Sequence, residues 1–142
     1  MGKLYEEDVI AWAEQQAALL RSGQWALLDV DNIAEEIEDV GKSEKRALRS
    51  HLVVLLVHLL KWELQPGRRG VSWIRTIGTR RAAIEDALED CPSLQALLDN
   101  REWLATSYRR AVRRAVAETG LKELPAGMPW TLVQLRDVDF FP

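Results

Sequence analysis

The chain has 142 residues, of which 47% are hydrophobic and 29% charged, and its 19 basic and 22 acidic side chains give a net charge of −3. This length can bury a real core without metal or disulfide cross-links, so we expect one domain over residues 1–142. The lone Cys91 excludes an internal disulfide framework and a cysteine-rich zinc module. The longest nearly apolar run, residues 52–60, is far shorter than the roughly 20 residues of a membrane span. We therefore expect a cytoplasmic protein that does not enter membranes.

The first helix is predicted from about Tyr5 to Ser22, because acidic side chains stand in its first turn, where free amide groups favour negative charge. Gly23 can end this helix in a left-handed conformation. Apolar residues that recur at helical spacing predict its buried face: Ile10, Ala13, Ala17 and Leu20.

A second helix is predicted from about Asp31 to Val40, and a third from Ser43 to Leu64. We place a break between them at Gly41, because glycine often ends a helix and serine often begins one. A regular apolar stripe predicts the buried side of the second helix: Val30, Ile33, Ala34, Ile37 and Val40.

The centre of the third helix, Leu52 to Leu60, is apolar nearly all round and is expected in the middle of the fold. A fourth helix is predicted over 72–90. A fifth begins at about residue 93 and reaches Thr119, either unbroken or interrupted near residues 99–100.

The C-terminal segment predicts one short helix, because Thr131 and Gln134 fit a capping box. Phe140 and Phe141 would waste apolar surface in solvent, so we expect this tail to dock on the body. No confident strand can be placed. The expected fold is all-α: a compact bundle of about five mostly antiparallel helices with a short C-terminal helix.

Four strings of the sequence occur together in one family: LYEEDVIAWAEQQAALLRSGQW, NIAEEIEDVGKSEKRAL, HLLKWELQPGRRGVSW and PWTLVQLRDVDFFP. With them the chain resembles, over nearly its whole length, the bacterial family known as domain of unknown function 29. The resemblance implies a small helical-bundle protein and supplies no mechanism. It carries over the Glu35–Glu36 pair and the string from His58 to Trp62.

The sequence offers no set of residues that predicts catalysis. Cys91 has no histidine near it in the chain, and no nucleophile-elbow motif is present. His51 and His58 lie about 10.5 Å apart along one helix, too far to share a metal ion. We predict no catalytic residues, no metal site and no cofactor, and we lean against an enzyme. The alternative is a metal-dependent bundle enzyme in which His58 acts with Glu35, Glu36 or Asp39.

The sequence contains two arginine clusters, and its predicted second helix is acidic. One runs from Arg68 to Arg81, and the other is predicted as a basic patch on the fifth helix. Like charges four residues apart on a helix repel, so an anion or an acidic surface is expected near them. A nucleic acid or a phosphate group is one candidate for that anion. The basic patch consists of Arg109, Arg110, Arg113 and Arg114.

The function predicted first is a non-catalytic module that binds a protein partner, or a second copy of itself, through charged helix faces. Lys61 and His58 share the edge of a very apolar helix, where core packing alone would ask for apolar residues. Trp62 stands where this helix leaves the core and is expected to be exposed. The predicted binding patch consists of Glu36, His58, Lys61, Trp62 and Arg75.

Overall fold

The computed structural model describes residues 2–142, with side chains from Leu4 onward, and this part contains helices and turns without a strand. The predicted all-α class is confirmed. Two compact units are present, Met1–Ser43 and Glu44–Pro142, called here the N-terminal and C-terminal units. The expectation of a single domain over residues 1–142 stays a prediction.

The N-terminal unit starts with α1 (Gly2–Glu7) and α2 (Val9–Arg21). Asp8 separates them, because its backbone is extended and its carboxylate accepts a hydrogen bond from the amide of Ala11. The single helix predicted from Tyr5 is therefore wrong at its start: Asp8 is an N-cap rather than a first-turn residue. Gly23 has φ of +72°, which confirms the left-handed end of α2.

The face by which α2 packs differs from the predicted one. Trp12 and Gln16 are buried, whereas Ile10 is 71% exposed. Both buried side chains reach the segment before α3: Trp12 donates its indole N–H to the Asp29 carboxylate at 3.0 Å, and Gln16 accepts the Asp29 amide at 2.8 Å. Hydrogen bonds to the segment that precedes a helix are not reflected in the spacing of apolar residues. The buried face of α2 was therefore predicted wrongly.

The long helix α3 (Val30–Leu64) runs without interruption through Gly41. The predicted break into two helices is wrong. One glycine inside a helix costs about 1 kcal/mol relative to alanine, which lowers helix stability without ending the helix. The space beside Gly41 is empty, and Gly41 has no positive φ.

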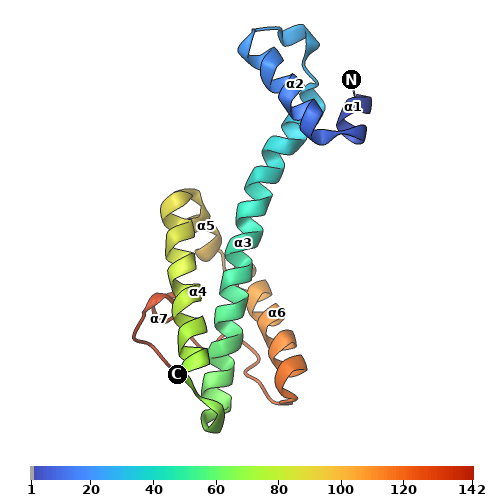
Figure 1. Cartoon of the computed structure of the whole chain (residues 1–142). Helices are drawn as coiled ribbons and strands as arrows, with labels where there is room; N and C mark the ends of the chain where they lie inside the picture. Colours follow the sequence, from blue (N-terminus) through green and yellow to red (C-terminus); the bar gives the residue numbers. More distant parts are fainter. Residues whose placement is uncertain (1) are drawn as a thin grey trace. The chain divides into compact units, whose positions relative to one another are not determined.

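The C-terminal unit surrounds the second half of α3 with α4 (Val71–Asp90) and α6 (Arg101–Thr119), and α4 runs antiparallel to both (Figure 1). The turns η1 (Trp25–Leu27), in the N-terminal unit, and η2 (Pro66–Arg68) precede α3 and α4 respectively. The core of this unit forms one cluster around Leu55, Leu56 and Leu59, which have no exposed surface. The predicted central position of residues 52–60 is confirmed.

A break separates α5 (Gln95–Leu98), which follows η3 (Pro92–Leu94), from α6. Asn100 makes this break, since its side chain accepts a hydrogen bond from the amide of Trp103 at 2.9 Å. Of the two predicted forms of the fifth helix, the interrupted one is found. Gly120, with φ of +72°, ends α6.

The C-terminal tail docks on the body, as predicted. Thr131 and Gln134 form the predicted capping box at the start of α7 (Leu132–Arg136). The Tyr108 hydroxyl donates to the carbonyl of Pro125 at 2.7 Å, and the Phe141 ring lies 4.9 Å from that of Trp62. These contacts anchor the tail at both its ends.

Candidate interaction surfaces

The two units carry opposite net charge. Residues 1–43 contain ten acidic and three basic side chains, a net charge of −7. Residues 44–142 contain twelve acidic and sixteen basic side chains, a net charge of +4. The net charge of −3 of the whole chain is therefore the sum of two larger charges of opposite sign. Each unit can attract a different class of partner.

The N-terminal unit leaves most of its large apolar side chains in solvent. Among its described side chains, Trp12 is the one hydrophobic residue classed as buried. Exposed apolar surface, where it is extensive, marks an interaction site. The exposed set comprises Val9, Ile10, Leu20, Trp25, Leu27, Val30, Ile37 and Val40.

The predicted burial of the α3 stripe is consequently wrong for its main members, since Ile37 is 68% exposed and Val30 is 62% exposed. Val30, Ala34 and Ile37 follow helical spacing and share one side of the helix. A parallel row of acids stands beside them at the same spacing. We call the two rows together the acidic α3 face, all of it exposed: Val30, Asp31, Ala34, Glu35, Ile37 and Glu38.

Glu36 lies on another side of α3 and serves the interior of the N-terminal unit. It accepts a hydrogen bond of 2.5 Å from the hydroxyl of Tyr5, whose ring packs edge-on against Trp12 at 4.7 Å. That hydrogen bond is the main cause that raises the pKa of Tyr5 to about 12. Glu36 thus has an internal partner, unlike its neighbour Glu35, which points into solvent.

His58 and Lys61 do come together, in the C-terminal unit. The Lys61 ammonium contacts the Glu118 carboxylate at 2.7 Å, and Arg114 contacts the same carboxylate at 3.0 Å. These two cations lower the pKa of Glu118. The half-buried His58 donates its Nδ1–H to the carbonyl of Val54 at 2.8 Å, and burial lowers its pKa. The His58 ring thus lies in a cluster that contains two cations and one acid.

The other two members of the predicted patch lie elsewhere. Trp62 was expected to be exposed, but it is half-buried between Phe141 and Arg69, whose guanidinium lies 5.0 Å from the centre of its ring. Trp25, 64% exposed, is the tryptophan that faces solvent. Arg75 is exposed on α4. The structure brings together His58 and Lys61 alone, and a binding role for the five residues stays a prediction.

The predicted basic patch forms a row along α6. Arg109, Arg110 and Arg113 are exposed on the side opposite the buried Ala111 and Ala115. Arg114 is turned toward Glu118 and is partly neutralised. Val116 is also exposed, one helical turn beyond Arg113. We call the outward row the basic α6 face: Arg109, Arg110, Arg113, Val116 and Ala117.

Arg49 extends this positive region and was not singled out from the sequence. Its guanidinium stacks on the Trp103 ring at 4.7 Å and donates to the hydroxyl of Ser107 at 3.2 Å. Burial and the nearby charge of Arg110 lower the pKa of Arg49. No local motif signals this contact, because its partners are more than fifty residues away in the chain.

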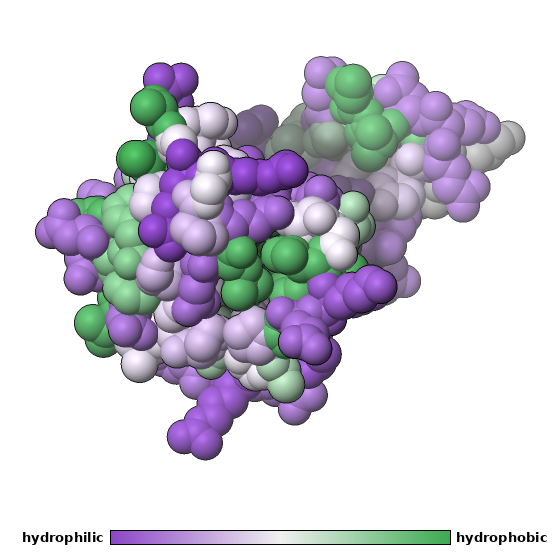
Figure 2. Space-filling view, turned by 90° about the horizontal axis from the view of Figure 1, so that it is seen from below, coloured by the Kyte–Doolittle hydropathy of each residue, from purple (hydrophilic) through white to green (hydrophobic). Residues whose placement is uncertain are grey.

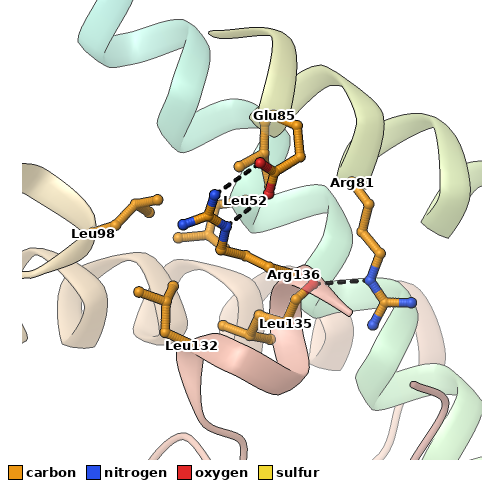
Figure 3. A pocket seen from close by; sticks show the side chains of 8 residues that line it. Leu52, Arg81, Glu85, Leu98, Leu132, Leu135 and Arg136 are labelled. Carbon is orange, nitrogen blue, oxygen red and sulfur yellow. Dashed lines mark hydrogen bonds and ion pairs between the residues drawn. The ribbon is translucent and has the colours of Figure 1, made fainter. Parts of the chain in front are cut away.

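A hollow lies between α3, α4, α5 and α7 and is lined mainly by leucines (Figure 3). At its border, Arg136 forms a bidentate ion pair with Glu85, with N–O distances of 2.7 and 2.8 Å. Arg81, predicted as part of a basic stretch, is buried here and donates to the carbonyl of Leu135 at 2.8 Å. The hollow contains about 250 Å³ of empty space, part of which is open to solvent. Its residues secure α7 to the body.

His51, the second histidine, accepts a hydrogen bond from Arg80 at 2.8 Å. Within residues 2–142, no three histidine, cysteine or acidic side chains are placed to hold one metal ion. None of the helices in the same part of the chain is both long and apolar enough to cross a membrane. On the side of the molecule seen in Figure 2, hydrophobic side chains appear as separate patches between hydrophilic ones.

The sequence match that decides the family is to domain of unknown function DUF29, and it covers residues 4–141. The chain belongs to the DUF29 family. This confirms the resemblance drawn from the four sequence strings. No curated protein and no solved structure matches the chain.

Proposed function

We propose that this DUF29 chain is a non-catalytic interaction module, located in the bacterial cytoplasm, whose N-terminal unit binds a protein surface. The observation that carries the proposal is the uncovered apolar surface of that unit. Eight of its large apolar side chains are exposed, in a unit of 43 residues.

The acidic α3 face has the composition of a docking helix. Interfaces need an apolar centre for affinity and charged residues around it for orientation and speed of association. The apolar centre consists of Val30, Ala34 and Ile37. The charged residues are those of the adjacent row, Asp31, Glu35 and Glu38.

The test is affinity capture from the native host with the full chain and two single variants. Ile37→Lys places a positive charge in the acidic α3 face, whereas the control Val133→Lys makes the same change at a valine of α7 that is 78% exposed. We expect one protein, which can be a second copy of the chain, to be retained by the wild type and by the control and lost by Ile37→Lys. Equal retention by both variants would contradict the assignment to the N-terminal unit.

A nucleic-acid or phosphate ligand is the second candidate, favoured by the exposed arginine row of the basic α6 face. Proteins that bind a phosphate backbone lose affinity steeply with salt, because counterions are released. Retention of a nucleic acid by the wild type, lost with Arg109→Glu and unaffected by Ile37→Lys, would favour this candidate over the first.

A further inference from the structure

We propose that the acidic α3 face of one copy of the chain binds the basic α6 face of a second copy. This inference rests on the proposed function and names its partner. It joins two exposed surfaces that the described contacts leave without a cover.

The charges of the two faces are opposite in sign and recur at helical spacing. On α3, Glu35 lies four residues after Asp31 and three before Glu38. On α6, Arg113 lies four residues after Arg109 and three after Arg110. The nearby Lys42 contacts Asp39, and Arg114 contacts Glu118, so neither neighbour neutralises the faces themselves. Two helices laid side by side can therefore pair acids with arginines along about two turns.

Each of the two faces also contains exposed apolar side chains. Val30, Ala34 and Ile37 project from α3, and Val116 and Ala117 accompany the arginines on α6. Small side chains between larger ones allow two helices to approach closely, with ridges of one in the grooves of the other. Burial of these exposed side chains would provide the affinity, and the charges would set the register.

A second copy is favoured over other occupants because the chain itself supplies both surfaces. Contact between two acidic α3 faces would bring rows of carboxylates together, which is unfavourable. Contact between an acidic and a basic face removes that repulsion and agrees with the opposite net charges of the two units, −7 and +4. Salt should weaken the contact between the two faces, because their charges are exposed and are therefore screened.

The experiment measures mass by light scattering or sedimentation over a range of concentrations, with two charge-reversal variants of the full chain. The first is Glu35→Lys with Glu38→Lys, and the second is Arg109→Glu with Arg113→Glu. The single reversals Glu89→Lys and Lys122→Glu, at exposed sites outside both faces, are the controls. Circular dichroism verifies that each variant keeps its helices.

We expect the wild type and the controls to reach at least twice the chain mass of 16.2 kDa at low salt and to dissociate at high salt. Each double variant alone should remain at 16.2 kDa. Mixing the two double variants should restore the larger species, because each reversed face then meets its new complement on the other chain.

Three results would overturn the proposal. The first is a wild type that stays at the single-chain mass at every concentration, and the second is association that persists in either double variant alone. The third is a mixture of the two double variants that does not restore the larger species. If Ile37→Lys still loses a foreign partner in the capture experiment, the proposed function stands and only the second copy as its partner is refuted.

Discussion

The two halves of α3 both contain apolar residues at helical spacing, and they differ in burial. From Leu48 to Leu60 the helix is covered by α4, α6 and the tail, and eight of its side chains are buried. From Val30 to Val40 a one-sided apolar stripe is largely exposed to solvent. The comparison teaches that apolar periodicity alone does not establish that a helix face is buried within its own chain.

Buried polar groups distinguish the units in a second way. The N-terminal unit is held by a few hydrogen bonds around Asp29 and Glu36, with one buried hydrophobic residue among its described side chains. The C-terminal unit has a contiguous apolar cluster to which the polar contacts of Arg81 and Tyr108 are added. Hydrophobic burial is the dominant favourable term in folding, so stability should reside mainly in the C-terminal unit.

The largest expected effect comes from cavities in the C-terminal core. Leu55→Ala should lower the free energy of unfolding by about 2–5 kcal/mol, because Leu55 is fully buried. Ile37→Ala should change it by less than about 0.5 kcal/mol, because Ile37 is exposed. Urea unfolding, monitored by circular dichroism at a concentration where the chain is monomeric, gives both values. Equal losses would erase the difference between the units.

A smaller effect is expected at the anchor of the tail. Tyr108→Phe removes only the hydroxyl that donates to the carbonyl of Pro125. The free energy of unfolding should fall by about 1 kcal/mol, the usual net value of such a bond. Tyr5→Phe, which removes a hydroxyl in the N-terminal unit, is the matched control in the same urea titration, and we expect it to leave the main transition unchanged. A main transition that responds to Tyr5→Phe as strongly as to Tyr108→Phe would contradict the division of stability.

A modest pH dependence should come from His58. Burial lowers its pKa in the folded chain below the ordinary 6.5, so the unfolded state takes up the proton first. Stability should therefore be complete above pH 6.5 and decrease as pH falls through the lowered pKa. His58→Gln should flatten this decrease in urea titrations between about pH 6.5 and 5, where carboxylates contribute little. An unchanged slope would show that the His58 ring is not held neutral by burial.

The smallest effect at neutral pH, and the sharpest local probe of the N-terminal unit, is the titration of Tyr5. Its pKa of about 12 depends first on the hydrogen bond to Glu36. Glu36→Gln should return the pKa toward 10, detected as tyrosinate absorbance, and Glu35→Gln should shift it much less. Absence of any difference between the two variants would place Glu36 outside the interior of the N-terminal unit.

Local signals in the sequence predicted the local features well. Gly23 and the Thr131–Gln134 capping box act through neighbouring residues, so their identity is enough. The wholly apolar stretch 52–60 likewise required cover on all sides. These features need no knowledge of distant parts of the chain.

The features that were predicted wrongly or missed depend on distant partners or on small differences in free energy. The continuation of α3 through Gly41 depends on a cost of about 1 kcal/mol that flanking helix can absorb. The burial of Trp12 and Gln16 instead of Ile10 depends on Asp29. The contact between Lys61 and Glu118 joins residues 57 positions apart, which no motif announces.

Hydrogen exchange along α3 tests the central claim most directly, because one continuous helix reports on both units. In dilute, monomeric chain, amides of residues 48–60 should exchange only through global unfolding. Amides of residues 33–40 should exchange at least an order of magnitude faster, and should slow as the concentration rises and the acidic α3 face becomes covered. Equal protection along the whole helix, unchanged by concentration, would contradict the account.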